Sequence, residues 1–431
     1  MNDRFVISGS DGVRTLRGSI AVAGSKNEAL KALPAALLYE DGLSIERVPD
    51  IEDIRRMREI LEALGARIED NGKGLLSVSA SGVRLTELPQ DIASQIRASI
   101  VVAGPLLARF GSATFYYPGG CLIGKRPIDV FLDGFRSFGA DIQQEDIGQS
   151  VRFTVTARGG RLRGGEIVLK VPSVTATETF LLAAIGAEGR TAIHNAALEP
   201  EVHALAQFLK DSGADIGGIG TPSLLIHGGA FLRAPHTYTV MSDRIETGTF
   251  AILAALAGDD LTITDCEPKH LKVPLSLLAR AGVRMEAGED SIHFSGNTDS
   301  RFDSLAVKTQ GYPGFPTDLQ PLLAVFLTQA EGESSIFETI FESRMEYLPE
   351  LRRMGASIET TSSLAHITGP TPLVGIETPA RDLRSGMAFL AAGLIAKGET
   401  IVHNGYNIDR GYAAIEERLR GVGADIVRRD E

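Results

Sequence analysis

The sequence predicts an α/β protein of two lobes, each built from three β-α-β-α-β repeats with apolar helices at its centre. Three observations support this fold class. The chain has 431 residues, which suits two domains or one large repetitive architecture. One glycine-containing phrase recurs six times along it, and a second, apolar phrase recurs between its copies. Internal repeats at a fixed period indicate one structural unit used several times.

The first phrase predicts six outer helices. Its copies are "LEALGARI", "FRSFGADI", "LKDSGADI", "LARAGVRM", "LRRMGASI" and "LRGVGADI". Their glycines lie 74, 74, 69, 73 and 68 residues apart, at Gly65, Gly139, Gly213, Gly282, Gly355 and Gly423. Glycine just after an amphipathic segment is typical of a helix end. Each copy is therefore expected to be a helix that stops at its glycine and runs into a strand.

The second phrase predicts six buried helices. Its copies are "NEALKALPAALL", "SQIRASIVVAGPLLA", "TATETFLLAAIGA", "IETGTFAILAALA", "DLQPLLAVFLTQA" and "DLRSGMAFLAAGLIA". These segments are apolar nearly all round, which is typical of helices without a solvent face. Several open on Ser, Thr, Asp or Asn, as capped helices do. Most are followed by a β-like run such as "GLSIERV" or "GRTAIHNA".

One such unit cannot bury both of its helices, but three units around a shared axis can. Six units therefore predict two lobes, residues 22–241 and residues 1–21 plus 242–431, with the break near Tyr238 to Gly248. The strand pair "FVISG" and "IAVAG" at the N-terminus can close either lobe on sequence grounds. A cleft between lobes is the expected ligand site.

Composition excludes several classes of function. A net charge of −12 argues against nucleic-acid or anionic-membrane partners, which favour broad basic patches. Apolar runs such as "SIVVAGPLLARF" are broken and shorter than the roughly 20 residues that span a bilayer. The N-terminus "MNDRFVISG" lacks a signal-peptide layout, and two cysteines make no disulfide framework, so we expect a cytoplasmic protein. No metal-binding or dinucleotide motif occurs, so no metal and no cofactor are expected.

Charged and polar side chains gather at the starts of the predicted buried helices, where free N–H groups and the helix dipole favour anions. Each residue alone has a plain structural interpretation. A loop cation is usually solvated, Asp318, Asp382 and Ser173 can be helix caps, and Arg244 can pair with Glu246. Recurrence at equivalent places favours a site for phosphate or carboxylate. The residues at the helix starts are Lys26, Asn27, Arg97, Arg244, Asp318, Asp382 and Arg384, to which the cysteine loop adds Lys125 and Arg126 and the last repeat adds Arg410.

The two cysteines differ in their surroundings. Cys266 in "TITDCEPKH" follows a strand and fits a small buried side chain. Cys121 in "PGGCLIGKRPID" stands among glycines, next to Lys125 and Arg126. Nearby cations lower a thiol pKa. No His stands close in sequence, so a Cys-His nucleophile is not indicated, and a reactive thiol on a glycine-rich loop is expected at Cys121.

The chain resembles the UDP-N-acetylglucosamine 1-carboxyvinyltransferase family of enolpyruvyl transferases. Ordered motifs across nearly the whole length carry the resemblance: "GSKN", "IRASI…GPLLARFG", "PGGCLIGKRPID", "DRIETGTF", "FPTDLQP", "ETIFESRMEYLPEL", "DLRSG" and "IDRGY". The family fold has two lobes, each an inside-out α/β barrel of three repeats. The resemblance implies transfer of the enolpyruvyl group of phosphoenolpyruvate to the 3′-hydroxyl of UDP-N-acetylglucosamine, with release of phosphate by addition and elimination.

The resemblance also implies residue roles. The catalytic residues are expected to be Cys121, Asp318, Lys26 and Arg410. Cys121 is expected to be the general acid, the site of a covalent phosphoenolpyruvate adduct and the fosfomycin target, and Asp318 is expected to be the base. Phosphoenolpyruvate is expected at Lys26, Asn27, Arg126 and Arg410. Asp382 and Arg384 are expected to assist. UDP-N-acetylglucosamine is expected at Asn27, Arg97, Arg126, Pro127, Ile128, Asp129, Val130, Ser173, Val174, Asp318 and Ile340.

Some positions depart from the family pattern. Leu122 stands where Thr is usual, Phe131 where His is usual, and Thr175 where Gly is usual, while a basic residue is displaced to Lys170. These departures affect nucleotide binding rather than the chemistry. Two alternatives remain. One is an enzyme like 5-enolpyruvylshikimate-3-phosphate synthase, although its "GNAGT" phrase is replaced here by "IRASI". The other is a non-catalytic paralogue that only binds a nucleotide-sugar.

Overall fold

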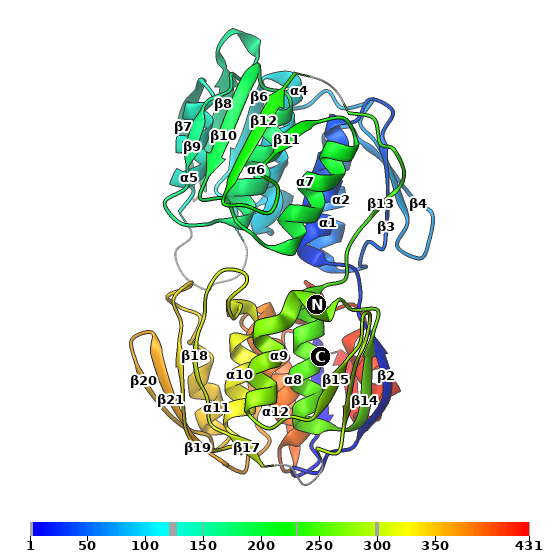
Figure 1. The fold of residues 1–431 in the computed structure, drawn as a ribbon, viewed down its shortest axis with the longest axis vertical. Coiled ribbons are helices and arrows are strands. Elements are labelled where there is room, and N and C mark those ends of the chain that lie inside the picture. Colours follow the sequence, from blue (N-terminus) through cyan, green and yellow to red (C-terminus); the bar gives the residue numbers. More distant parts are fainter. Residues whose placement is uncertain (1–2, 120–126, 149, 230–231, 298–300, 431) are drawn as a thin grey trace. The chain divides into compact units, whose positions relative to one another are not determined.

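A computed structural model describes residues 3–119, 127–148, 150–229, 232–297 and 301–430. The chain divides into two compact units, and it passes between them at residues 23–24 and 241–242. We call residues 24–119 and 127–241 the first lobe, and residues 3–23 and 242–430 the second lobe (Figure 1).

The first lobe contains three sheets and a central group of buried helices within its described residues. The sheets have the strand orders β13-β3-β5-β4, β6-β8-β7 and β11-β12-β10-β9. Its α-helices (α), 3-10 helices (η) and strands (β) are α1 (Lys26–Ala35), η1 (Ala36–Leu38), β3 (Leu43–Glu46), α2 (Glu52–Ala63), β4 (Arg67–Asp70), β5 (Leu76–Ser79), α3 (Gln90–Ala93), η2 (Arg97–Val102), α4 (Ala103–Phe110), β6 (Ser112–Tyr116), α5 (Asp129–Ser137), β7 (Ala140–Ile147), β8 (Ser150–Ala157), η3 (Arg158–Gly160), β9 (Glu166–Val168), α6 (Val174–Ile185), β10 (Gly189–His194), α7 (Pro200–Asp211), β11 (Asp215–Gly217), β12 (Ser223–Gly228) and β13 (Tyr238–Thr239).

The second lobe repeats this plan in its described part. Its sheets have the orders β22-β23-β1-β24, β15-β16-β14-β2 and β17-β19-β21-β20, and β18 also pairs with β19. The elements are β1 (Asp3–Ser8), β2 (Leu16–Ala21), α8 (Arg244–Ala257), β14 (Gly258–Thr264), η4 (Pro268–Leu271), α9 (Lys272–Arg280), β15 (Met285–Ala287), β16 (Ile292–Ser295), β17 (Phe302–Asp303), β18 (Ala306–Lys308), η5 (Thr317–Leu319), α10 (Gln320–Leu327), β19 (Ala330–Phe337), α11 (Leu348–Arg353), β20 (Ser357–Thr361), β21 (Leu364–Gly369), β22 (Glu377–Pro379), α12 (Leu383–Ile395), β23 (Glu399–His403), α13 (Tyr406–Asp409), α14 (Ile415–Gly421) and β24 (Ile426–Asp430).

The predicted outer helices are α2, α5, α7, α9, α11 and α14. Each ends just before the glycine of its repeated phrase, and all six glycines have a positive φ, between 74° at Gly139 and 106° at Gly355. Glycine adopts this left-handed conformation without the steric penalty of a side chain, so it turns the chain from a helix into the next strand. The repeated glycine therefore marks the six places where the backbone needs a positive φ after an outer helix.

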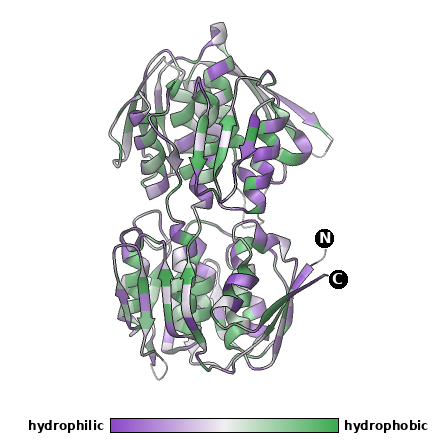
Figure 2. Ribbon diagram, turned by 90° about the vertical axis from the view of Figure 1, so that its right-hand side faces the viewer, coloured by the Kyte–Doolittle hydropathy of each residue, from purple (hydrophilic) through white to green (hydrophobic). Residues whose placement is uncertain are grey.

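The buried helices form the core of each lobe. Every residue from Ala176 to Ile185 of α6 is buried, and so is every residue of α12. Such helices have no polar face, so sheets and outer helices must cover them on all sides. The residues of these helices are accordingly mostly hydrophobic, green in Figure 2. This arrangement, with helices inside and sheets outside, confirms the predicted inside-out α/β fold.

The two N-terminal strands belong to the second lobe. β1 lies between β23 and β24 and pairs antiparallel with both. β2 pairs in parallel with β14. The repeat pattern by itself let these strands close either lobe, and their pairing partners come from the last and the fourth repeats.

Candidate active site

The starts of the buried helices lie together in the first lobe. α1 contacts η2, and η1, which continues α1, contacts α4, which continues η2. A side chain placed at Gly104 of α4 would lie 2.5 Å from the carbonyl oxygen of Thr179 in α6, and one at Gly186, after α6, would lie 2.5 Å from that of Ala108. The three helices therefore run in the same direction. Their aligned dipoles place free N–H groups and partial positive charge at one end of the lobe.

The first turn of α1 carries Lys26 and Asn27. Ser25 caps this helix by accepting from the backbone N–H of Glu28. Lys26 is 9% exposed, and its Nζ lies 2.7 Å from Oδ2 of Asp53 in the first turn of α2. This ion pair holds the ammonium at the start of α1. Asp53 was not recognised from the sequence, where it stands in an ordinary acidic helix start.

Arg97 begins η2 and binds both sides of the segment that contains Cys121. Its guanidinium donates to the carbonyl oxygens of Pro118 and Pro127, each at 3.4 Å. Cys121 and Arg126 themselves lie outside the described residues. Beyond Pro127, Ile128 is buried and forms the N-cap of α5, whereas Asp129 is exposed and Val130 is half-buried.

Ser173 is the N-cap of α6, as its plain interpretation predicted. Its Oγ accepts from the backbone N–H of Ala176 at 3.3 Å. Ser173 and Val174 are half-buried at the start of that helix. The cap uses one lone pair of the hydroxyl, so its proton remains available to a ligand.

In the second lobe, Asp318 is held between two arginines. Its Oδ1 lies 2.7 Å from Nη2 of Arg344, and its Oδ2 lies 3.2 Å from Nη2 of Arg384. The arginine side chains are 3% and 7% exposed, while the Asp318 side chain is 28% exposed. The two buried arginines thus fix the orientation of the carboxylate, and part of it remains accessible to solvent. The helix-cap interpretation of Asp318 is wrong, because Pro316 and Leu319 occupy the cap positions of η5 and α10.

Arg384 is a permanently charged member of this group. It donates to the hydroxyl of Tyr412 at 3.0 Å, and that hydroxyl lies 2.8 Å from Oγ1 of Thr249 in α8. Burial alone lowers the pKa of Arg384, but Tyr412, Asp318 and Asp243 together raise it above its ordinary value. Hydrogen bonds thereby connect the starts of all three buried helices of this lobe.

Asp382 caps α12 and also faces Arg344. Its Oδ1 accepts from the backbone N–H groups of Arg384 at 2.9 Å and Ser385 at 3.2 Å, and Ser385 completes a capping box. Nη1 of Arg344 lies 3.7 Å from the same oxygen. The two interpretations of Asp382, cap and member of a charged group, are therefore both correct.

The loop that carries Ile340 is joined to this group through Glu338. The buried Glu338 carboxylate accepts from the backbone N–H of Ile340 at 2.8 Å and from the hydroxyl of Thr317 at 3.0 Å. Ile340 remains 43% exposed. Arg410, 8% exposed, follows α13 and stands two residues before Tyr412. Within the second lobe, the sequence-predicted residues Asp318, Asp382 and Arg384 are brought into contact.

Sequence reasoning missed Arg344 and Tyr412. Arg344 lies within the quoted motif "ETIFESRMEYLPEL", and its isolation among apolar and acidic residues was the available signal. Tyr412 had no charge to attract notice. The pair proposed for Glu246 differs from the structure: Glu246 accepts from Arg418 at 2.6 Å, while Arg244 lies over the ring of Tyr312.

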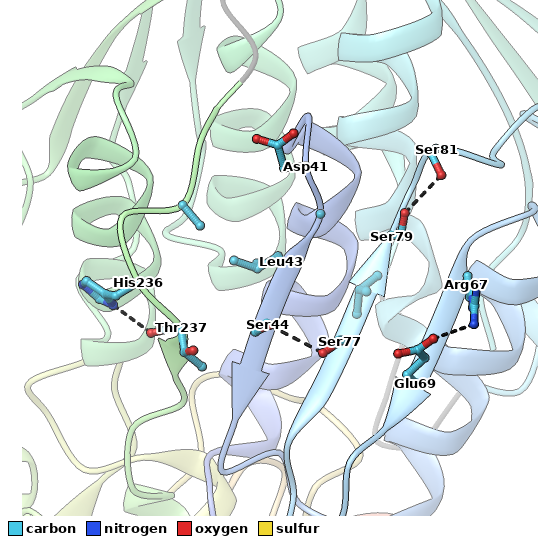
Figure 3. A pocket seen from close by; sticks show the side chains of 13 residues that line it. Asp41, Leu43, Ser44, Arg67, Glu69, Ser77, Ser79, Ser81, His236 and Thr237 are labelled. Carbon is cyan, nitrogen blue, oxygen red and sulfur yellow. Dashed lines mark hydrogen bonds and ion pairs between the residues drawn. The ribbon is translucent and has the colours of Figure 1, made fainter.

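One cavity in the first lobe is lined by none of the predicted site residues. It measures about 460 Å³ and lies on the outer face of the sheet β13-β3-β5-β4, where Figure 3 shows a row of serine hydroxyls between Asp41, Arg67 and His236. A smaller cavity of about 250 Å³ is lined by Arg344, Asp382 and Ser385. We assign functional weight to the smaller one because Arg344, which lines it together with Asp382, also binds Asp318.

The described residues contain no group of His, Cys, Asp and Glu suited to a metal ion. No helix in that part of the chain has the length and apolar character needed to cross a membrane.

Comparisons with known proteins agree with this geometry. The family model of EPSP synthase (3-phosphoshikimate 1-carboxyvinyltransferase) matches residues 10–419. The UDP-N-acetylglucosamine 1-carboxyvinyltransferase of Desulfosudis oleivorans is 44% identical, with 99% of each chain covered. The UDP-N-acetylglucosamine 1-carboxyvinyltransferase 1 of Caldanaerobacter subterraneus subsp. tengcongensis is 41% identical, with 100% of each chain covered. The solved enolpyruvyl transferase NikO from Streptomyces tendae has a TM-score of 0.88 at 28% identity, with 99% of each chain covered.

The family model and the full-length relatives both identify an enolpyruvyl transferase, and the fold and the charged helix starts are consistent with one. The chain therefore belongs to the UDP-N-acetylglucosamine 1-carboxyvinyltransferase family of enzymes.

Proposed function

We propose that this enzyme transfers the enolpyruvyl group of phosphoenolpyruvate to the 3′-hydroxyl of UDP-N-acetylglucosamine and releases phosphate. The sugar oxygen bonds to C2 of phosphoenolpyruvate while its own proton leaves and another proton adds to C3. The resulting tetrahedral ketal then loses phosphate as the C2–O bond breaks. A proton leaves C3 at the same time and the C=C bond re-forms. The chemistry needs a base, an acid and fixed cations.

The geometry of Asp318 is the observation that carries this proposal. A base for a hydroxyl must be oriented, ionised and accessible. Arg344 and Arg384 each bind one oxygen of Asp318, and its side chain is still 28% exposed. We therefore assign the removal of the sugar proton to Asp318. Fixed arginines also stabilise negative charge that develops on carboxylate and phosphate during the reaction.

The remaining roles are assigned by resemblance and by position on the buried helix starts. Phosphoenolpyruvate is assigned to Lys26, Asn27, Arg126 and Arg410, and supporting contacts to Asp382 and Arg384. The nucleotide-sugar is assigned to Asn27, Arg97, Arg126, Pro127, Ile128, Asp129, Val130, Ser173, Val174, Asp318 and Ile340. Support comes from the ion pair that fixes Lys26 and from the two proline carbonyls that hold Arg97.

Cys121 is assigned as the acid that protonates C3. A thiol close to cations can give its proton to carbon and accept a covalent bond. The same property makes Cys121 the proposed site of a phosphoenolpyruvate adduct and of fosfomycin alkylation. The activity corresponds to the first committed step of peptidoglycan synthesis, a cytoplasmic step that supports cell-wall biogenesis, cell shape and division.

Phosphate release tests the proposal. Purified protein is incubated with phosphoenolpyruvate plus UDP-N-acetylglucosamine, with phosphoenolpyruvate plus shikimate 3-phosphate, and with each compound alone. Release is expected only in the first mixture. Release with shikimate 3-phosphate would instead indicate the related synthase activity, and release in no mixture would indicate a non-catalytic paralogue.

A further inference from the structure

A buried carboxyl group lies in the same helical turn as Lys26 and Asn27. Glu28 is the third residue of α1 and is 1% exposed. Its Oε1 accepts from the hydroxyl of Tyr238 at 2.5 Å, and its Oε2 accepts from the backbone N–H of Met241 at 2.8 Å. Ser25, which caps α1, donates its backbone N–H to the carbonyl oxygen of Met241 at 2.8 Å. Glu28 therefore ties the first turn of α1 to residues 238–241.

The side chains that face Glu28 carry no positive charge. Glu201 at the start of α7 and Glu178 in α6 both act on it as like charges, and Tyr238 is a buried phenol. The cations on its own helix are directed elsewhere: Nζ of Lys31 lies 3.1 Å from Glu178 and 2.6 Å from the carbonyl oxygen of Asn27.

Charged groups on the other neighbouring elements are also directed elsewhere. Lys26 pairs with Asp53 of α2. Arg97 of η2 donates to proline carbonyls. Tyr39, after η1, shares a hydrogen bond with Ser212.

This environment favours the uncharged acid. Burial raises the pKa of Glu28 from its ordinary value of 4.5 to about 8, because desolvation outweighs the two hydrogen bonds that lower it, and the nearby carboxylates add to the rise. In the protonated state one oxygen can donate to Tyr238 while the other accepts from Met241, so both contacts survive. Ionisation would place a negative charge in a low-dielectric region that already holds Glu178 and Glu201.

The second lobe contains a counterpart that is held by an ion pair. Glu246 holds the same third position in α8 and is 2% exposed. It accepts from the backbone N–H of Ala23 at 2.6 Å, but its carboxylate is paired with Arg418 at 2.6 Å. In both lobes a buried glutamate thus ties the first turn of a buried helix to a neighbouring segment. The glutamate of α8 makes an ion pair, and that of α1 does not.

We propose that Glu28 is a positioning residue for the substrate-binding turn of α1, and that it acts as an uncharged carboxylic acid bound to Tyr238 and to the backbone of Met241. The inference rests on the proposed function, in which Lys26 and Asn27 contact substrate. Ionisation of Glu28 loosens the first turn of α1 and moves the Lys26 ammonium away from phosphoenolpyruvate. The consequence is a higher KM for phosphoenolpyruvate with a smaller change in kcat.

Stability depends on pH with a defined sign. The folded protein holds the Glu28 proton up to a pH of about 8, whereas the unfolded chain releases it near 4.5. The folded state therefore binds more protons across this window, and Glu28 makes stability fall as pH rises through it. Above both values the contribution is constant.

Glu28→Gln and the matched Glu246→Gln test the proposal. Glutamine keeps the shape of the uncharged acid and can donate to Tyr238 and accept from Met241. For the wild type, kcat/KM for phosphoenolpyruvate is expected to fall above pH 8, by up to tenfold per pH unit. Glu28→Gln is expected to retain the neutral-pH value and to lose this alkaline decline. Glu246→Gln is expected to keep the decline and to lower Tm at every pH.

An unchanged alkaline decline in Glu28→Gln would overturn the proposal, and so would inactivity of a folded Glu28→Gln protein at all pH values, because Glu28 would then act as an anion. Tyr238→Phe provides a second variant. The hydrogen bond from the Tyr238 hydroxyl lowers the pKa of Glu28, so the loss of that hydroxyl is expected to shift the alkaline decline of kcat/KM to higher pH. A shift of the decline to lower pH would contradict the proposal.

Thermal unfolding separates this inference from the proposed function. If the wild type releases no phosphate, the proposed function fails, but Tm between pH 6 and pH 9 still reports on Glu28. The loss of Tm over that interval is expected to be smaller in Glu28→Gln than in the wild type. Equal losses in the two proteins would refute an uncharged Glu28 without reference to catalysis.

Discussion

Replacing Arg344 by methionine tests whether the orientation of Asp318 depends on its arginine contacts. Methionine fills much of the same volume but removes three interactions. These are the 2.7 Å contact with Asp318, the 3.7 Å contact with Asp382 and the 3.2 Å hydrogen bond to Oγ1 of Thr317. Arg384 then remains the only one of the two arginines that binds Asp318.

The magnitude follows from these contacts. A hydrogen bond that involves a charged group contributes about 1.5–3 kcal/mol, and the contacts of Arg344 with Asp318 and Thr317 are both of this kind. Because Asp318 is partly exposed, solvent offsets part of the first, and the expected loss of unfolding free energy is about 3 kcal/mol. In a domain of roughly 200 residues each kcal/mol lowers Tm by about 2–4 °C, which predicts a decrease of roughly 6–12 °C. Misplacement of the base by about 1 Å predicts a roughly 100-fold lower kcat.

Phosphate release at saturating substrates and calorimetry measure the two effects. Arg344→Lys retains the charge but not the planar fork that bridges several acceptors, so intermediate values are expected. Arg136→Met serves as a surface control, since Arg136 pairs with Asp133 in an exposed position and its loss is expected to change stability by less than about 0.5 kcal/mol. A kcat within threefold of wild type in Arg344→Met would refute the assigned role.

Three further predictions follow from named contacts. Cys121 is expected to be alkylated much faster than Cys266 at neutral pH, because Cys266 is 1% exposed; mass spectrometry that found Cys266 labelled first would contradict this. Asp318→Ala is expected to abolish turnover and to retain phosphoenolpyruvate binding in titration calorimetry, whereas a near-normal rate would exclude it as the base. Gly134→Ala is expected to lower stability by about 1–3 kcal/mol, because the new methyl group would lie 2.1 Å from the ring of Phe180; an unchanged denaturation midpoint would contradict tight packing there.

The repeat made the fold predictable. Apolar helices without a polar face must lie inside, and glycine at a helix end indicates a turn into a strand. Both features depend on neighbouring residues alone, so they can be read from the two repeated phrases. The pairing partners of the N-terminal strands could not be named, because β23, β24 and β14 are distant from them in sequence. Pairing over such distances leaves no local pattern.

A site residue could be predicted where its type and position in the sequence already indicate a role. It could not be predicted where its role depends on a contact that only the fold creates. Asp382 and Arg384 were found because charged residues at a buried helix start require an explanation. Arg344 and Tyr412 were missed because their importance depends on Asp318 and Thr249, which only the fold brings near them. Glu28 was missed for the same reason: nothing in "GSKNEAL" indicates that its carboxyl group faces Tyr238.

The position of β1 between β23 and β24 determines when the protein can finish folding. On one side, β1 pairs with Ile426–Asp430 of β24. Residues 24–241 leave the ribosome long before β24 has been made. At about 5–20 residues per second, β1 waits at least about 20 seconds without its final neighbour, and its exposed backbone groups can pair wrongly during that time. The first lobe can fold during this interval, whereas the second requires the completed chain. Loss of the last few residues would therefore leave β1 at a sheet edge.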